Sequence, residues 1–121
     1  LTWKATCHHK RNLMEHAKNF AELHKTQYLY MMYVWGHSYE FTADDNWELI
    51  EEFCRFIGGR DDIWYAANIE IVDYMKAARN LKFTVDGDLV YNPGALSVWV
   101  SVEENGEKKM VEVGAGQTVH L

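Results

Sequence analysis

The chain has 121 residues, of which 48% are hydrophobic and 25% charged, and its formal net charge is −6. This composition excludes a disordered or collagen-like chain, and the acidic charge argues against a nucleic-acid partner, because phosphate contacts need a basic face. The two cysteines, Cys7 and Cys54, are too few for a disulfide framework, and no apolar run is long enough to span a membrane. We therefore expect a soluble protein without a membrane partner; the sequence leaves the compartment open and favours the cytoplasm.

Aromatic residues make up 14% of the chain, which is a high share for so short a sequence. The sequence begins at Leu1 with neither an initiator Met nor a signal peptide. We therefore expect it to be a piece of a longer protein.

The first 80 residues alternate between helical patterns and apolar runs. Apolar residues at helical spacing predict a helix over 12–24, and the continuous apolar run over 28–35 predicts a strand covered on both faces. A second helix is expected over 45–57, a short buried strand over 63–66, and a third helix from residue 68. The order helix-strand-helix-strand-helix is typical of an α/β fold with a parallel sheet.

After residue 80 the pattern changes to strands and turns. The segment Asp86-Gly87-Asp88 is a strong hairpin signal, and alternating apolar residues predict half-buried antiparallel strands. The expected strands cover 81–85, 89–91, 96–102, 110–113 and 118–121. We therefore divide the chain into an α/β domain over 1–80 and an antiparallel β appendage over 81–121.

The first candidate site is His37, which follows the predicted strand over 28–35 and the residue Gly36. Active sites in parallel-sheet proteins lie beyond the carboxyl ends of the strands, so His37 is a candidate for acid-base catalysis. Glu40 is spaced to orient the ring or to bind a substrate hydroxyl, and Trp35 is the aromatic residue expected nearest the site. The alternative is a loop histidine bonded to a backbone carbonyl.

The second candidate is the segment Cys7-His8-His9. Cysteine and histidine are zinc ligands, but adjacent residues seldom converge on one ion, and no partner pair lies at zinc-finger spacing. We therefore expect a polar loop before the first helix, and no metal site within this chain.

Five segments, taken in order, resemble the C-terminal half of the bacterial polysaccharide deacetylase family, the carbohydrate esterases with the nodulation-factor deacetylase fold. The most specific stretches are VWGHSYEF and NWELIEEF, and the resemblance covers nearly the whole chain. The segments are 3–9, 33–41, 46–54, 62–66 and 91–93.

The resemblance implies part of a distorted (β/α) barrel and the hydrolysis of acetamido groups on carbohydrates. In this family an Asp and two His of the first half hold a divalent, zinc-like metal, a second Asp is the base, and a late His protonates the leaving amine. Val34-Trp35-Gly36-His37 is similar to the family's late Leu-x-His motif. The match makes His37 the general acid, with Val34 or Trp35 lining the acyl pocket.

The sequence has no His-x-x-x-His and no Asp-Asp motif after an early strand, which are the family's metal and base motifs. The resemblance therefore implies a fragment that is inactive alone and holds no metal of its own. Its expected partners are a carbohydrate substrate and either a second copy or the missing N-terminal half, because half a barrel leaves strand edges uncovered. The alternative is a non-catalytic module for carbohydrate binding or assembly.

Overall fold

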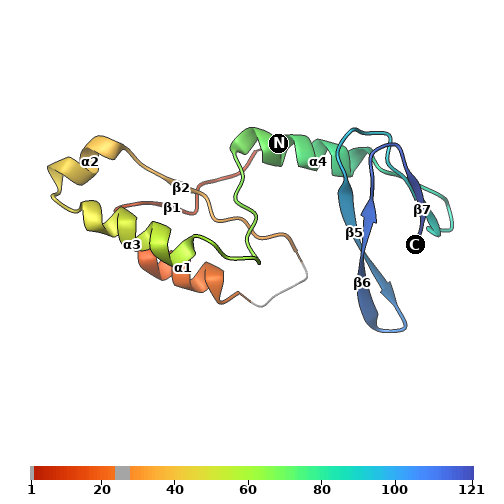
Figure 1. Ribbon diagram of the computed structural model, residues 1–121, viewed down its shortest axis with the longest axis horizontal. Helices are drawn as coiled ribbons and strands as arrows, with labels where there is room; N and C mark the ends of the chain where they lie inside the picture. The colour runs from red at the N-terminus through yellow and green to blue at the C-terminus, as the bar shows by residue number, and fades with distance from the viewer. Residues whose placement is uncertain (1, 24–27) are drawn as a thin grey trace. The chain divides into compact units, whose positions relative to one another are not determined.

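A computed structural model describes residues 2–23 and 28–121 and shows a mixed α/β fold (Figure 1). By their contacts the residues divide into two compact units, Leu1–Trp64 and Tyr65–Leu121. In the described part of the chain, no helix combines the length and the apolarity needed to cross a membrane. The first unit contains β1 (Cys7–His8), α1 (Leu13–Ala21), β2 (Val34–Trp35), α2 (Ser38–Ala43) and α3 (Trp47–Ile57).

The two short strands of the first unit are parallel. Cys7 lies opposite Val34 and His8 opposite Trp35, and the backbone N–H of His9 donates to the carbonyl of Trp35 at 3.0 Å. The parallel pairing brings the carboxyl ends of β1 and β2 side by side. The residues that follow these two strands are therefore neighbours in space, although nearly thirty residues of chain separate them.

Helix α1 supplies much of the core of the first unit. It contacts β1 and α3, and Figure 1 shows α1 and α3 lying along each other. Leu13 and Ala17 are buried on the apolar face of α1, and Cys7 and Phe41 are buried from β1 and α2. This packing fixes the end of β1 against the helices.

The described residues form no closed barrel, and the expected helix-strand-helix-strand-helix order is wrong. The run over 28–35 is a strand only at Val34–Trp35, residues 63–66 form no strand, and α2 was not expected. A buried strand needs pairing partners and two covered faces. Tyr28 and Leu29 instead are 75% and 85% exposed, because no described segment covers them. The first helix ends at Ala21, and residue 24 of the predicted span lies outside the described residues.

The second unit is the antiparallel β structure that the sequence predicts, together with the third helix. Strands β3, β4 and β7 form one sheet in that order, and β5 and β6 form a long hairpin. Helix α4 contacts β5, and the hydroxyl of Tyr74 accepts the backbone N–H of Trp99 at 3.1 Å. The elements are α4 (Asn68–Asn80), β3 (Lys82–Phe83), β4 (Leu89–Tyr91), β5 (Val98–Glu104), β6 (Glu107–Val113) and β7 (Thr118–His120).

Asn92 is the polar centre of the second unit. Its side chain is fully buried, and its amide nitrogen donates to the carbonyls of Leu96 at 2.7 Å and Val113 at 2.9 Å. Its Oδ1 accepts the N–H of Gly94 at 2.9 Å. Asn92 therefore joins the turn after β4 to the end of β6. This structural role explains the presence of an asparagine in the segment 91–93.

We predict that Asn92→Ala destabilises the second unit. The substitution leaves two carbonyls and one amide without their partner, and each buried group left unpaired costs about 1–3 kcal/mol. The free energy of unfolding measured in urea should fall by about 2 kcal/mol or more. Asn80→Ala, at the exposed end of α4, is the matched control and should have little effect. Equal stability of the two variants would contradict the role of Asn92.

Candidate functional site

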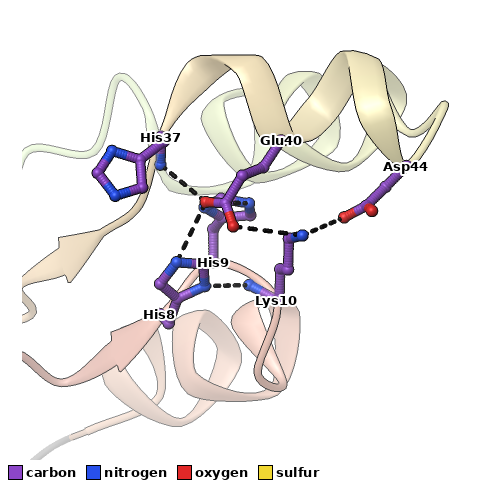
Figure 2. Close-up of polar contacts among 6 residues, drawn as sticks. All are labelled: His8, His9, Lys10, His37, Glu40 and Asp44. Atoms are coloured by element: carbon purple, nitrogen blue, oxygen red, sulfur yellow. Dashed lines mark hydrogen bonds and ion pairs between the residues drawn. The ribbon is translucent and has the colours of Figure 1, made fainter.

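The candidate site lies where β1 and β2 end (Figure 2). His8 is the last residue of β1 and His9 follows it, while His37 follows β2 and precedes α2. Glu40, on the first turn of α2, points back toward the two histidines of the β1 end (Figure 2). The site therefore depends on the parallel pairing of two short strands.

Glu40 is the residue that the others share. Its Oε2 accepts the backbone N–H of His37 at 3.0 Å, which caps the start of α2. The same oxygen lies 3.2 Å from Nε2 of His8 and 3.8 Å from Nε2 of His9. The other oxygen, Oε1, lies 3.3 Å from Nζ of Lys10. The carboxylate is only 16% exposed, so it lies mostly out of solvent.

The ammonium of Lys10 lies between two carboxylates, 2.7 Å from Asp44 and 3.3 Å from Glu40. Its hydrogen bond to Asp44, with a further contribution from Glu40, raises the pKa of Lys10. Burial alone would raise the pKa of Glu40, but the His37 amide and the Lys10 ammonium outweigh it and hold that pKa below its ordinary value. Lys10 and Glu40 are therefore both charged at neutral pH.

His9 is a buried histidine held by ring packing. Its side chain is 3% exposed, and its ring stacks on Phe41 with centroids 4.3 Å apart. The backbone of Gly36 passes so close that a Cβ there would lie 1.8 Å from Nδ1 of His9. Among the described residues, Nε2 of His9 has no hydrogen-bond partner. A buried polar atom left in this state is unusual in a folded protein.

His8 completes the cluster from the end of β1. Its ring lies 4.4 Å from that of His9 and meets Trp35 edge-on at 4.5 Å. Its Nδ1 accepts the backbone N–H of Lys10 at 3.3 Å. The expected polar loop over 7–9 is therefore wrong, because Cys7 and His8 form a strand and the histidines pack into the site.

The imidazole of His37 lies on the outside of the site. Figure 2 shows it turned away from Glu40, which contacts the main chain of His37 and not its ring. The ring stacks on Tyr39 with centroids 5.2 Å apart and meets Trp35 edge-on at 6.2 Å. The structure thus places His37, Trp35 and Glu40 together, but Glu40 does not orient the His37 ring.

An open cavity of about 590 Å³ adjoins the cluster. Its lining includes His8, Arg11, His16 and Trp35, whereas the half-buried Val34 lies outside it. The cavity combines an exposed aromatic ring with basic side chains. His8 belongs both to the lining of this cavity and to the cluster around Glu40.

Two imidazole nitrogens and one carboxylate oxygen thus lie within 4.8 Å of one another, at His8, His9 and Glu40. This donor set suits a divalent transition metal. The sequence predicted Glu40 as a site residue, whereas His8 and His9 were considered as zinc ligands and a polar loop was expected instead. The signal that could have identified them is their place at the end of a strand parallel to the one before His37.

Comparison with protein-family models, with curated proteins and with solved structures finds no match to this chain. The resemblance to polysaccharide deacetylases therefore stays a prediction that depends on the sequence segments alone.

We predict that Gly36→Ala displaces the His9 ring. Gly59→Ala is the matched control, because both glycines have a positive φ but a Cβ at Gly59 meets no described atom within 4 Å. Alanine is strained by the positive φ at both positions, and only Gly36→Ala also adds overpacking of about 1–3 kcal/mol against the His9 ring. Urea unfolding and the NMR shifts of the His9 ring measure the effect. An unshifted His9 in a folded Gly36→Ala variant would contradict the close packing.

Proposed function

We propose that this chain takes part in the hydrolysis of acetamido groups on carbohydrates, and that His37 is the general acid for the leaving amine. The observation that carries the proposal is the placement of His37. Its ring lies beside two exposed aromatic rings, just beyond the carboxyl end of a parallel strand. In α/β folds with parallel strands this is the edge where substrates bind.

A general acid must reach the substrate and exchange its proton near neutral pH. Imidazole is the side chain suited to that exchange, and the exposed ring of His37 is open to a substrate. Glu40 fixes the main chain of His37 through the amide bond at 3.0 Å. The carboxylate therefore positions the loop that carries the acid, while the ring remains free to meet the leaving nitrogen.

The aromatic residues beside His37 suit the substrate class. Trp35 is 51% exposed and Tyr39 is 68% exposed, and flat aromatic faces bind the apolar faces of sugar rings. We assign Trp35 to sugar or acyl contact. Val34 has the same role only by the family resemblance, because its half-buried side chain lies outside the cavity beside Trp35.

The resemblance also implies a divalent metal, which when bound activates water and polarises the carbonyl. The ligand motif that the family uses for this metal has no counterpart in the sequence. His8, His9 and Glu40 are a different set of residues with suitable donor atoms, including the unpartnered Nε2 of His9. The contribution we assign to this chain is the acid and the substrate contacts, and we expect no turnover from these 121 residues alone.

A second candidate function, carbohydrate binding or assembly without catalysis, is favoured by the apolar surface. Tyr28, Leu29, Tyr30 and Met31 are consecutive and all exposed. Contiguous exposed apolar residues are typical of contact sites. A second copy of the chain or the other half of a barrel would cover them.

The catalytic proposal predicts that His37→Ala lowers turnover. The measurement is acetate release from N-acetylglucosamine oligomers, by a protein that joins this chain to the family's metal-binding half. Loss of a general acid lowers the rate by about 10²–10⁴-fold. His120→Ala, an exposed histidine of the second unit, is the control. Equal turnover of His37→Ala and the parent would remove His37 from the mechanism.

Carbohydrate binding by the 121-residue chain, measured together with turnover, distinguishes the catalytic function from the non-catalytic module. We predict that N-acetylglucosamine oligomers shift the NMR signals of Trp35 and Tyr39, and that Trp35→Ala weakens binding by about tenfold, as expected for the loss of one stacking ring. Binding together with a His37-dependent turnover supports catalysis. Binding without any His37 dependence supports the non-catalytic module.

A further inference from the structure

We propose that His8, His9 and Glu40 form a binding site for a divalent transition metal, and that zinc is the ion this donor set favours. This inference does not depend on the proposed function, because it concerns an equilibrium between the chain and the ion. The residues come from the end of β1 and the first turn of α2 (Figure 2).

The spacing of the donor atoms is close to that of a zinc site. Tetrahedral ligands at about 2.0–2.1 Å from zinc lie about 3.3 Å from one another. Oε2 of Glu40 lies 3.2 Å from Nε2 of His8 and 3.8 Å from Nε2 of His9. These two distances are close to the tetrahedral value, and the three donor atoms all lie within 4.8 Å of one another.

The buried nitrogen of His9 is an independent sign of a missing partner. This ring is fixed by Phe41 and by Gly36, so it cannot turn toward solvent without disrupting the packing. Its Nε2 points toward the carboxylate, but at 3.8 Å it is beyond hydrogen-bonding distance and has no partner among the described residues. A metal ion between His9 and Glu40 would satisfy this nitrogen.

The surrounding charges also suit a cation. Glu40 offers Oε2 to the histidines, while Oε1 is held by Lys10. The ammonium of Lys10 is in turn paired with Asp44 at 2.7 Å. The carboxylates of Glu40 and Asp44 and the ammonium of Lys10 together carry a net charge of −1, which would partly offset the charge of a divalent ion. The Lys10 contact orients the carboxylate, as outer-shell partners do in metal sites.

Binding requires one proton shift at His8. In the structure its Nδ1 accepts the Lys10 amide, so the neutral ring carries its proton on Nε2. Coordination through Nε2 moves that proton to Nδ1 and releases the 3.3 Å contact with the Lys10 amide. The ¹⁵N shifts of the His8 ring therefore report metal binding directly.

Nitrogen donors select among the divalent ions. Imidazole suits zinc, copper, nickel and iron, whereas magnesium and calcium prefer oxygen ligands. Three protein ligands leave a fourth position of tetrahedral zinc open to solvent or a small ligand. Of the three proposed ligands, His8 also lines the open cavity of about 590 Å³.

The test is a calorimetric titration of the tag-free 121-residue chain with zinc chloride. We expect one ion per chain, and at least a tenfold loss of affinity in both His8→Ala and Glu40→Gln, because even outer-shell changes cost 10–100-fold. Glu40→Gln keeps an oxygen that can accept the His37 N–H. Magnesium should not compete, and zinc should shift the His8 ring signals.

His9→Ala removes a buried ring, which would disturb the packing of the first unit. The metal site is therefore tested by His8→Ala and Glu40→Gln, once circular dichroism shows that both variants are folded. His120→Ala should bind zinc as the parent does. His37→Ala should also keep its zinc affinity, which separates this inference from the catalytic proposal. Absence of zinc binding by the folded parent chain, or equal affinity in Glu40→Gln and the parent, would overturn the site.

Discussion

The carboxylate of Glu40 is the interaction on which the rest of the site depends. One oxygen receives the amide of His37 and faces the two imidazoles at the end of β1, and the other oxygen holds Lys10. A single side chain thus joins the segments that follow two parallel strands. Because the pKa of Glu40 is held below its ordinary value, the carboxylate stays ionised at neutral pH and can attract cations.

Packing gives this carboxylate a rigid setting. The His9 ring stacks on Phe41 and lies so close to Gly36 that any side chain at position 36 would displace it. The two histidines therefore face Glu40, while His37 turns its ring outward toward Trp35 and Tyr39 (Figure 2). The site thus has an inner set of nitrogen and oxygen donors at His8, His9 and Glu40, and an outer set of rings at Trp35, His37 and Tyr39 to which we assign the proposed function.

Short sequence patterns predicted the structural features that are determined by residues close together in the chain. The turn at Asp86-Gly87-Asp88 and the alternation over 96–102 correctly predicted antiparallel strands, although β5 begins only at Val98. The position after an apolar run made His37 and Glu40 candidates, and the structure brings Glu40 to the main chain of His37. The prediction of a buried strand over 28–35 was wrong, because hydrophobicity alone cannot show whether neighbouring segments exist to cover such a run. The convergence of His8 and His9 on Glu40 was missed, because it arises from a parallel pairing between distant segments.

The most direct test of the account is the position of zinc in crystals of the full chain grown with the ion. Anomalous diffraction at the zinc edge should give one peak bounded by Nε2 of His8, Nε2 of His9 and Oε2 of Glu40, with bonds of about 2.0–2.2 Å. Lys10 should remain on Oε1. Zinc bound at other residues, with the Glu40 cluster empty, would contradict the account.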